Sequence, residues 1–190
     1  KIIVIAPHAF SDTSHNDGQI LFIDYYHHFI ETLNFVSKLK SKNILWLVRP
    51  HPSSHLYGEK GIVEKVLKKY QNKYLKICPK TNNKNLINIC DHAVTCTGRI
   101  ALEFASFGKK SIMGGINDIS EFNFFELSYS KKKYFLKLKN VLNIKKLSKD
   151  KIAKAKKMIY YLDNHKPLKF ISPSNILSSK IIGNYRKTGI

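Results

Sequence analysis

The segment that decides the fold runs from Asp91 to Ile112 and reads Asp-His-Ala-Val-Thr-Cys-Thr-Gly-Arg-Ile-Ala-Leu-Glu-Phe-Ala-Ser-Phe-Gly-Lys-Lys-Ser-Ile. Its apolar run at 92–96 predicts a buried strand, and a second run at 110–113 predicts another. The stretch between them, 97–107, predicts a helix, and Gly108 follows it, as glycine commonly does at a helix C-terminus. Strands joined by a helix lie parallel, so the segment predicts one unit of a parallel sheet.

Apolar runs and amphipathic stretches alternate along the rest of the chain. Further strands are predicted at 2–6, 44–48 and 74–78, and further helices at 20–39, 61–70, 85–90, 149–162 and 173–185. An irregular, aromatic-rich segment is predicted at 114–130, and a solvated loop at the lysine run 131–133. Alternation of this kind predicts the α/β class: a Rossmann-like, doubly wound parallel sheet of about five strands with flanking helices.

Ligands of doubly wound sheets bind at the carboxyl ends of the strands, near the point where the strand order reverses. That rule singles out the segments 7–17, 49–54, 79–83, 95–103 and 114–123. The last of them opens with Gly114-Gly115, which either lets a ligand approach the backbone or is a plain exit loop.

In the first of these segments, residues 7–15 carry two histidines and one aspartate just after a buried strand. Asp12 and His15 are the candidates for acid–base catalysis, because carboxyl and imidazole groups exchange protons readily. The other interpretation is a capping loop before the long helix, with Asn16 or Asp17 as the N-cap.

The second segment, Arg49-Pro-His-Pro-Ser-Ser54, is stiff and cationic. Its prolines restrict the backbone, and Arg49, His51 and Ser53 offer hydrogen-bond donors that suit a phosphate. The other interpretation is a plain turn in which proline ends the strand.

The segment 95–103 joins a strand to a helix through Thr97, Gly98 and Arg99. Such a turn exposes backbone N–H groups that attract an anion, and Arg99 adds a positive charge. Glu103 is then placed to reach a ribose, if the phosphates lie at the turn. The alternative is a threonine N-cap followed by a solvated glutamate. Neither G-x-G-x-x-G nor G-x-x-x-x-G-K-[ST] occurs, which argues against dinucleotide oxidoreductases and P-loop enzymes.

Composition narrows the classes of protein further. The chain has 190 residues, 43% of them hydrophobic, with 33 Lys and Arg against 13 Asp and Glu and a net charge of +20. This length fits one domain, and this apolar fraction excludes a disordered basic tail. The charge favours nucleic acid, an acidic membrane surface or a phosphorylated small molecule as partner. A compositional bias toward lysine is the other explanation, since lysines are scattered among many Ile and Asn.

Three cysteines, Cys78, Cys90 and Cys96, form no paired framework and no metal-binding spacing. They fit free thiols in a reducing compartment. We expect neither a metal nor a cofactor. No apolar run approaches the roughly 20 residues of a membrane span, and the first residues do not read as a signal peptide. The cytoplasm is therefore the expected location.

Two stretches resemble the C-terminal half of GT-B glycosyltransferases: Trp46-Leu-Val-Arg-Pro-His-Pro52, and the segment from Asp91 to Ile112. The most similar families are bacterial capsule and surface-polysaccharide enzymes, including Kdo transferases, His-Pro-motif sialyltransferases and CDP-glycerol glycerophosphotransferases. The phrase His8-Ala-Phe-Ser-Asp-Thr-Ser-His15 resembles a loop of capsular polysaccharide transferases. The resemblance covers roughly residues 1–115.

This resemblance implies a domain that binds the nucleotide of an activated sugar donor, with a CMP- or CDP-linked donor favoured and UDP left open. His51 matches the histidine that contacts the donor phosphate, and Thr97 and Gly98 match the small-residue turn at the phosphates. Glu103 matches the glutamate that holds the ribose. With Arg49 and Arg99, these residues form the expected donor site.

The resemblance also sets the expected partners and boundaries. We expect a nucleotide-binding domain at 1–147 with C-terminal helices at 148–190 packed on it, and an N-terminal acceptor domain absent from this chain. The acidic motif that accompanies His-Pro in sialyltransferases is missing; Asn16-Asp17-Gly18 matches it only in part. The expected acceptor is a saccharide or lipid-linked glycan, with peripheral association at an anionic inner membrane, and nucleic acid is not an expected partner.

Two alternatives stay open at this point. A UDP-sugar epimerase of the GT-B type shares the architecture and differs in needing no acceptor. A basic nucleic-acid-binding module would instead use the +20 charge and bind with strong salt dependence.

Overall fold

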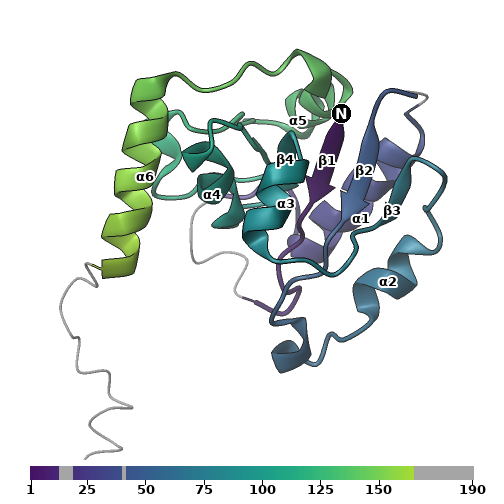
Figure 1. Cartoon of the computed structure of the whole chain (residues 1–190). Coiled ribbons are helices and arrows are strands. Elements are labelled where there is room, and N and C mark those ends of the chain that lie inside the picture. The colour runs from purple at the N-terminus through teal and green to yellow at the C-terminus, as the bar shows by residue number, and fades with distance from the viewer. Residues whose placement is uncertain (13–18, 40–41, 165–190) are drawn as a thin grey trace, which may run out of the picture. The chain divides into compact units, whose positions relative to one another are not determined.

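Five parallel strands form the sheet of the computed structural model, which describes residues 1–12, 19–39 and 42–164 (Figure 1). The strands are β1 (Ile2–Ile5), β2 (Leu45–Val48), β3 (Leu75–Ile77), β4 (His92–Thr95) and β5 (Ile112–Met113). Their order across the sheet is β3-β2-β1-β4-β5, and every neighbouring pair is parallel. The predicted class and strand number are confirmed, and the order reverses beside β1.

Helices connect the strands. They are α1 (Tyr25–Ser37), α2 (Ile62–Leu67), α3 (Asn83–Ile89), α4 (Ile100–Ser106), α5 (Lys131–Lys139) and α6 (Lys149–Asn164), with short 3-10 turns η1 (Ser54–Tyr57), η2 (Ser120–Phe122) and η3 (Val141–Asn143). The chain divides into two compact units, 1–156 and 157–190. Within the described part of the second unit, 157–164, α6 continues to its end. The helix predicted at 173–185 lies outside the described residues.

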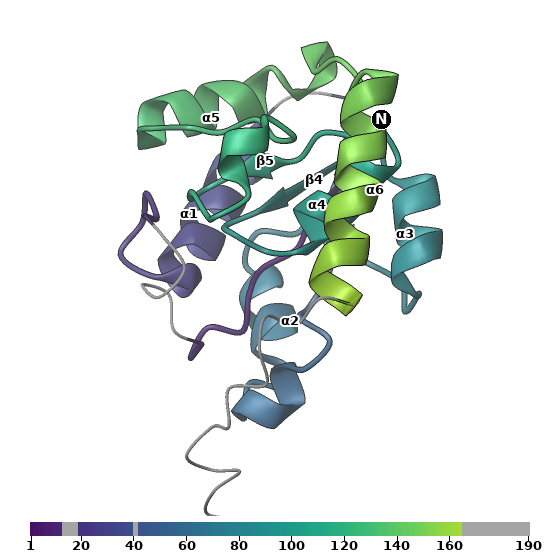
Figure 2. The same ribbon diagram turned by 90° about the vertical axis from the view of Figure 1, so that its left-hand side faces the viewer.

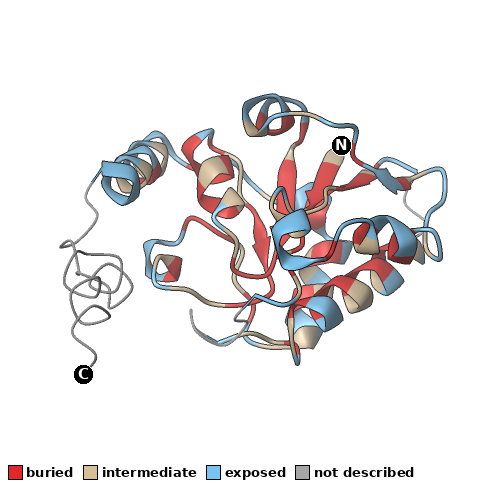
Figure 3. Ribbon diagram, turned by 90° about the horizontal axis from the view of Figure 1, so that it is seen from below, coloured by how far each residue is buried: buried red, intermediate tan, exposed pale blue. Residues whose placement is uncertain are grey.

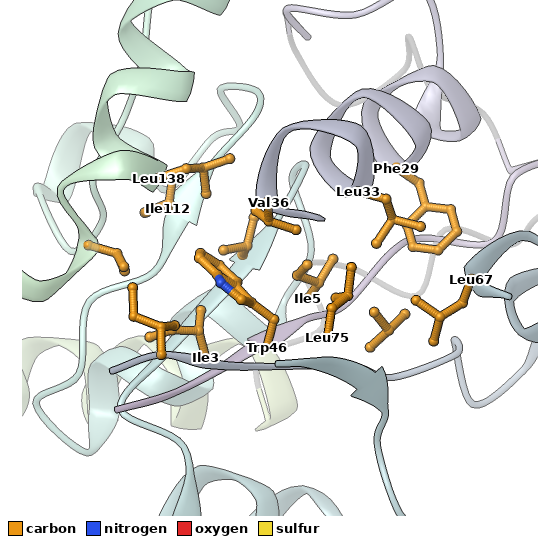
Figure 4. Packing of buried hydrophobic residues seen from close by; sticks show 14 of the residues in the cluster. Ile3, Ile5, Phe29, Leu33, Val36, Trp46, Leu67, Leu75, Ile112 and Leu138 are labelled. Atoms are coloured by element: carbon orange, nitrogen blue, oxygen red, sulfur yellow. The ribbon is translucent and has the colours of Figure 1, made fainter. Parts of the chain in front are cut away.

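Both faces of the sheet are covered by helices and buried. Successive side chains of a strand point to opposite faces, so a strand buried on both faces contributes to two cores. Ile3 and Ile5 pack in a core with residues of α1, α2 and α5, whereas Val4 packs in a second core with residues of α3 and α4. Trp46 is the largest fully buried side chain and lies among the aliphatic residues of the first core (Figure 4). Figure 3 shows buried residues along the strands and exposed ones on the outer helix surfaces.

Helix α1 begins later than predicted. Its N-cap is Asp24, whose carboxylate accepts a hydrogen bond from the backbone N–H of His27 at 2.7 Å. The upstream Ile20 forms an isolated antiparallel bridge with Gly115, so the expected start at residue 20 is wrong. The caps considered from the sequence, Asn16 and Asp17, lie outside the described residues.

The lysine run 131–133 opens helix α5, so its prediction as a loop is wrong. The Ser130 side chain caps the helix and accepts from the Lys133 N–H. Tyr134 and Leu138, four residues apart, are fully buried against the sheet and α1. Figure 2 shows α5 beside α1. This spacing places both on one helix face, and the three lysines before it hid the pattern.

Gly114 and Gly115 lie close to side chains of the chain itself. A Cβ at Gly114 would lie 2.6 Å from His28 Cδ2, and one at Gly115 would lie 2.8 Å from Thr97 Cγ2. Neither glycine lines the cleft described below. Close packing against the chain's own side chains explains the pair, an explanation beside the two, ligand approach and a plain exit loop, that the sequence left open.

Leu138→Ala tests whether α5 belongs to the core. The Leu138 side chain is 0% exposed, so its truncation should cost roughly 2–5 kcal/mol of unfolding free energy in urea denaturation. Leu136, on the same helix, is 55% exposed, and its alanine variant should stay within about 0.5 kcal/mol of the parent. Equal effects of the two substitutions would mean that α5 does not pack as described.

Candidate functional site

A cleft of about 200 Å³ opens at the carboxyl ends of β1, β2 and β4, where the strand order reverses. This is the position at which doubly wound sheets bind ligands. It is lined by Ala6, Pro7 and His8 after β1, by Arg49, Pro50, His51 and Pro52 after β2, by Thr95 of β4, by Gly98 and Arg99 of the turn that follows, by Ile100 and Glu103 of α4, and by Asn83 of α3.

Most of the predicted donor-site residues meet in this cleft. Five of the seven line it: Arg49, His51, Gly98, Arg99 and Glu103. Ser53 and Thr97 are not among the lining residues. Asp12 is exposed and also lies outside the lining, and His15 is not among the described residues.

The Arg49 guanidinium lines the cleft, and one of its nitrogens donates a hydrogen bond within the protein. Its Nη2 donates to the backbone carbonyl of Thr81 at 3.3 Å. Its Nη1 is buried and has no hydrogen-bond partner among the described residues. Leaving a buried donor of a charged group unpaired costs on the order of 1–3 kcal/mol or more. An anion in the cleft would supply the missing acceptor.

His51 is held by its own turn. Its Nδ1 accepts a hydrogen bond from the Ser53 backbone N–H at 3.3 Å. A neutral imidazole with Nδ1 as acceptor carries its proton on Nε2, so His51 presents an N–H donor from that atom. Ser53 thus orients the ring through its main chain, while its hydroxyl lies outside the lining.

His8 also lines the cleft, although sequence analysis did not select it as a site residue. Its Nε2 accepts from the Thr97 backbone N–H at 3.2 Å, and its ring stacks on Tyr25 with centroids 4.1 Å apart. The pKa of His8 is lowered to about 4, mainly by burial and to a smaller extent by the nearby His51, with Asp12 acting in the opposite direction. The ring is therefore neutral at neutral pH, with its proton on Nδ1. Its place directly after Pro7 at the end of β1 was the available signal.

Thr97, which follows β4, is hydrogen-bonded to His8, which follows β1. Its N–H is taken by His8, and its Oγ1 lies 3.3 Å from the Tyr25 hydroxyl. Its side chain is buried. Gly98 must be small, because an added Cβ would lie 2.7 Å from Thr95 Oγ1 and 3.3 Å from His8 Nε2.

Glu103 meets a second residue that was not predicted. Asn83 Nδ2 donates to Glu103 Oε2 at 2.8 Å, and both residues line the cleft. Asn83 is the first residue of α3 and the last residue of the segment 79–83. That segment was singled out by topology, but it contains no motif that marks the asparagine.

Glu59 ties the loop after β1 to the connection after β2. Its carboxylate is buried and accepts from the N–H groups of Phe10 at 2.8 Å and Ser11 at 2.6 Å, and from the Ser11 hydroxyl at 2.6 Å. These bonds position the chain immediately before Asp12. The two loops that flank the cleft therefore hold each other.

The described residues also bear on metal binding, membrane spanning and thiol chemistry. Among the described residues, no group of three or more His, Cys, Asp or Glu could hold a metal ion, and no helix is long and apolar enough to cross a membrane. Cys96 lies beside the turn, but burial raises the pKa of its thiol to about 12, so it is not a thiolate nucleophile.

His8→Gln tests the burial of the neutral ring through pH dependence. A histidine with a lowered folded pKa stabilises the fold fully above pH 6.5 and loses this contribution as the pH falls toward the folded value. At pH 5.0, the contribution of His8 to the unfolding free energy should be smaller by roughly 2 kcal/mol than at pH 7.5. The glutamine side chain of His8→Gln keeps an acceptor for the Thr97 N–H but does not titrate. Between pH 7.5 and 5.0, the unfolding free energy of the variant should therefore fall by roughly 2 kcal/mol less than that of the parent.

Burial also lowers the pKa of His28, to about 3. His28 remains in the His8→Gln variant, so part of the acid sensitivity should persist there. Identical pH profiles for parent and variant, measured by urea denaturation, would mean that the His8 ring is not buried in its neutral form.

Comparisons with known proteins show similarity of fold. No protein-family model and no curated protein sequence matches the chain. The solved structure of Thermosulfurimonas dismutans KpsC, a beta Kdo 2,7 transferase, is 21% identical over 82% of this chain and 44% of its own, with a TM-score of 0.50. S. aureus MnaA, solved with UDP, is 13% identical over 86% of this chain and 46% of its own, with a TM-score of 0.53. The chain spans less than half the length of either.

Proposed function

We propose that this chain is the donor-nucleotide-binding part of a glycosyltransferase of the surface-polysaccharide type. The observation that carries the proposal is Arg49: a guanidinium with a buried nitrogen lacking an acceptor among the described residues, in a cleft at the strand-order reversal. An anionic ligand fits this environment, and the cleft offers polar groups at two separate places for the two ends of a nucleotide.

The phosphates bind at the end nearest the strands. Arg49 contributes a charge and planar N–H donors, His51 contributes its Nε2–H, and Arg99 adds a second cation at the rim. Thr97 does not contact the phosphates in this proposal; its N–H donates to His8 and fixes the turn beside Gly98. In this arrangement the cations stabilise the phosphate that leaves during transfer.

The ribose binds at Glu103. Glu103 follows Gly98 by five positions, which corresponds to roughly 7.5 Å along a helix. That separation suits a phosphate at the turn and a sugar ring at the carboxylate. The carboxylate accepts hydrogen bonds from ribose hydroxyls.

In the proposed reaction, an acceptor hydroxyl attacks the anomeric carbon of the donor sugar. The bond between that carbon and the phosphate oxygen breaks, and the electron pair leaves with the phosphate. The acceptor proton passes to a base, for which the loop 7–15 offers Asp12 and His15. The acceptor is a saccharide or a lipid-linked glycan.

A pyrimidine nucleotide is the proposed donor group. CMP or CDP is favoured by the His-Pro resemblance, and UDP is supported by the UDP that accompanies the MnaA structure. A titration series of CMP, CDP, UDP and GDP by calorimetry or thermal shift separates these choices.

His51→Ala should weaken binding of the preferred nucleotide by roughly tenfold to a hundredfold, because a hydrogen bond to a charged group contributes roughly 1.5–3 kcal/mol. His55→Ala is the matched control, since His55 is exposed and lies four residues further on, in η1. If no nucleotide binds the parent, the proposed function fails. If His51→Ala binds as well as the parent, the role given to His51 fails.

Peripheral association with an anionic membrane is part of the proposal, and the charge distribution supports it. Residues 131–156 hold eleven lysines and one acidic residue, Asp150, and so carry +10 of the chain's net +20. Lysines occur along the whole chain, and this segment carries half of the net charge. Exposed Leu136 and Leu142 lie among these lysines. Basic surfaces with apolar side chains attract anionic lipid.

Lys132, Lys133 and Lys139 are exposed on α5, so a triple Lys→Glu variant tests this surface. The variant should lose flotation with vesicles of phosphatidylcholine and phosphatidylglycerol. The control variant changes the exposed Lys65, Lys68 and Lys69 to Glu, with the same change in net charge, and should still float. Equal loss in both variants would count against a lipid-facing surface at α5, and so would equal flotation with pure phosphatidylcholine.

A further inference from the structure

We infer that Asn83 is a positioning residue that makes the cleft select a ribose over a 2′-deoxyribose. It does so by holding the Glu103 carboxylate. The inference rests on the proposed function, since it needs a nucleotide in the cleft. No sequence motif marks Asn83; its position in the structure does.

The position of Asn83 is itself secured by local structure. The preceding residue, Asn82, is the N-cap of α3, and its side chain accepts from the Asn85 N–H at 2.8 Å. Asn83 is therefore the first helical residue, at a defined place beside the cleft. From there its Nδ2 reaches Glu103 Oε2 at 2.8 Å.

The chemistry of this contact suits a carboxylate that must bind a ligand. A lysine or arginine partner would neutralise Glu103, whereas the amide of Asn83 is uncharged and leaves the carboxylate its negative charge. Among the residues that the structure describes, Glu103 forms no ion pair. With Oε2 held, Oε1 stays directed and able to accept from a hydroxyl.

The same short segment also contacts the phosphate end of the cleft. Arg49 Nη2 donates to the Thr81 carbonyl, only two residues before Asn83. The connection between β3 and α3 thus touches both the guanidinium and the carboxylate. This connection sets the relative placement of the two groups that grip the nucleotide. A ligand bound through its phosphates then places its ribose hydroxyls beside the Glu103 carboxylate, whose orientation is fixed by Asn83.

Calorimetric titrations with CDP and with 2′-deoxy-CDP test the inference. The parent should bind CDP about tenfold more tightly, since the lost hydroxyl removes a hydrogen bond to a charged acceptor. Asn83→Ala should reduce this preference to about twofold or less, while its affinity for 2′-deoxy-CDP stays within about twofold of the parent's. A purely structural role would weaken both ligands alike.

Two further variants keep the result interpretable. Asn83→Asp is isosteric, so it should fold, and it places a second carboxylate beside Glu103; it should also lose the preference. Asn85→Ala, on the exposed side of the same helix, should retain it. Thermal unfolding of each variant checks that the fold is intact.

The outcomes separate the inference from the proposal beneath it. If the parent binds neither nucleotide, the proposed function falls and the inference falls with it. If the parent binds both equally, nucleotide binding stands and ribose selection is wrong. If Asn83→Ala and Asn83→Asp keep the parent's preference, Glu103 needs no positioning by Asn83.

Discussion

Burial of β1 on both faces is the constraint on which the rest of the structure depends. Ile3, Val4 and Ile5 are all 0% exposed, and they face alternate sides of the sheet. A strand with no solvated face needs helices on both sides and a paired strand at each edge. The chain meets this need by placing β2 on one side of β1 and β4 on the other. Beside the reversal, the connections after β1 and β4 lead to helices on opposite faces of the sheet, and the cleft lies between them.

Main-chain hydrogen bonds fix the tautomers of the two histidines that line the cleft, His8 and His51. Backbone N–H groups donate to His8 and to His51, and each bond decides which ring nitrogen carries the proton. His8 is kept neutral by burial, while Arg49 keeps its charge with one nitrogen lacking an acceptor among the described residues. Such an arrangement is costly without a ligand and favourable with an anionic one. Loop positions are held by Glu59 on one side and by Asn83 on the other.

Sequence reasoning recovered the sheet and most of the cleft for physical reasons. Continuous apolar runs have few alternatives to a doubly buried strand, and strand ends marked by Pro7 and Pro50 are unambiguous. Topology then brought Arg49, His51 and Glu103 together without any contact being known. Helix α5 was missed because the lysine run before Tyr134 outweighed a short apolar period. Asn83 and His8 were missed because their importance depends on a partner distant in sequence, Glu103 for one and Thr97 for the other.

The measurement that tests the central claim most directly is a titration of the ¹⁵N-labelled chain with CDP, followed through its backbone amide resonances. Binding in the cleft predicts the largest shifts at His8, His51, Gly98 and Arg99, since these residues line it. The Thr97 amide should shift as well, because its hydrogen bond to His8 lies directly behind the turn. Shifts confined to α5 and α6, with the cleft amides unmoved, would contradict a nucleotide site at the strand-order reversal.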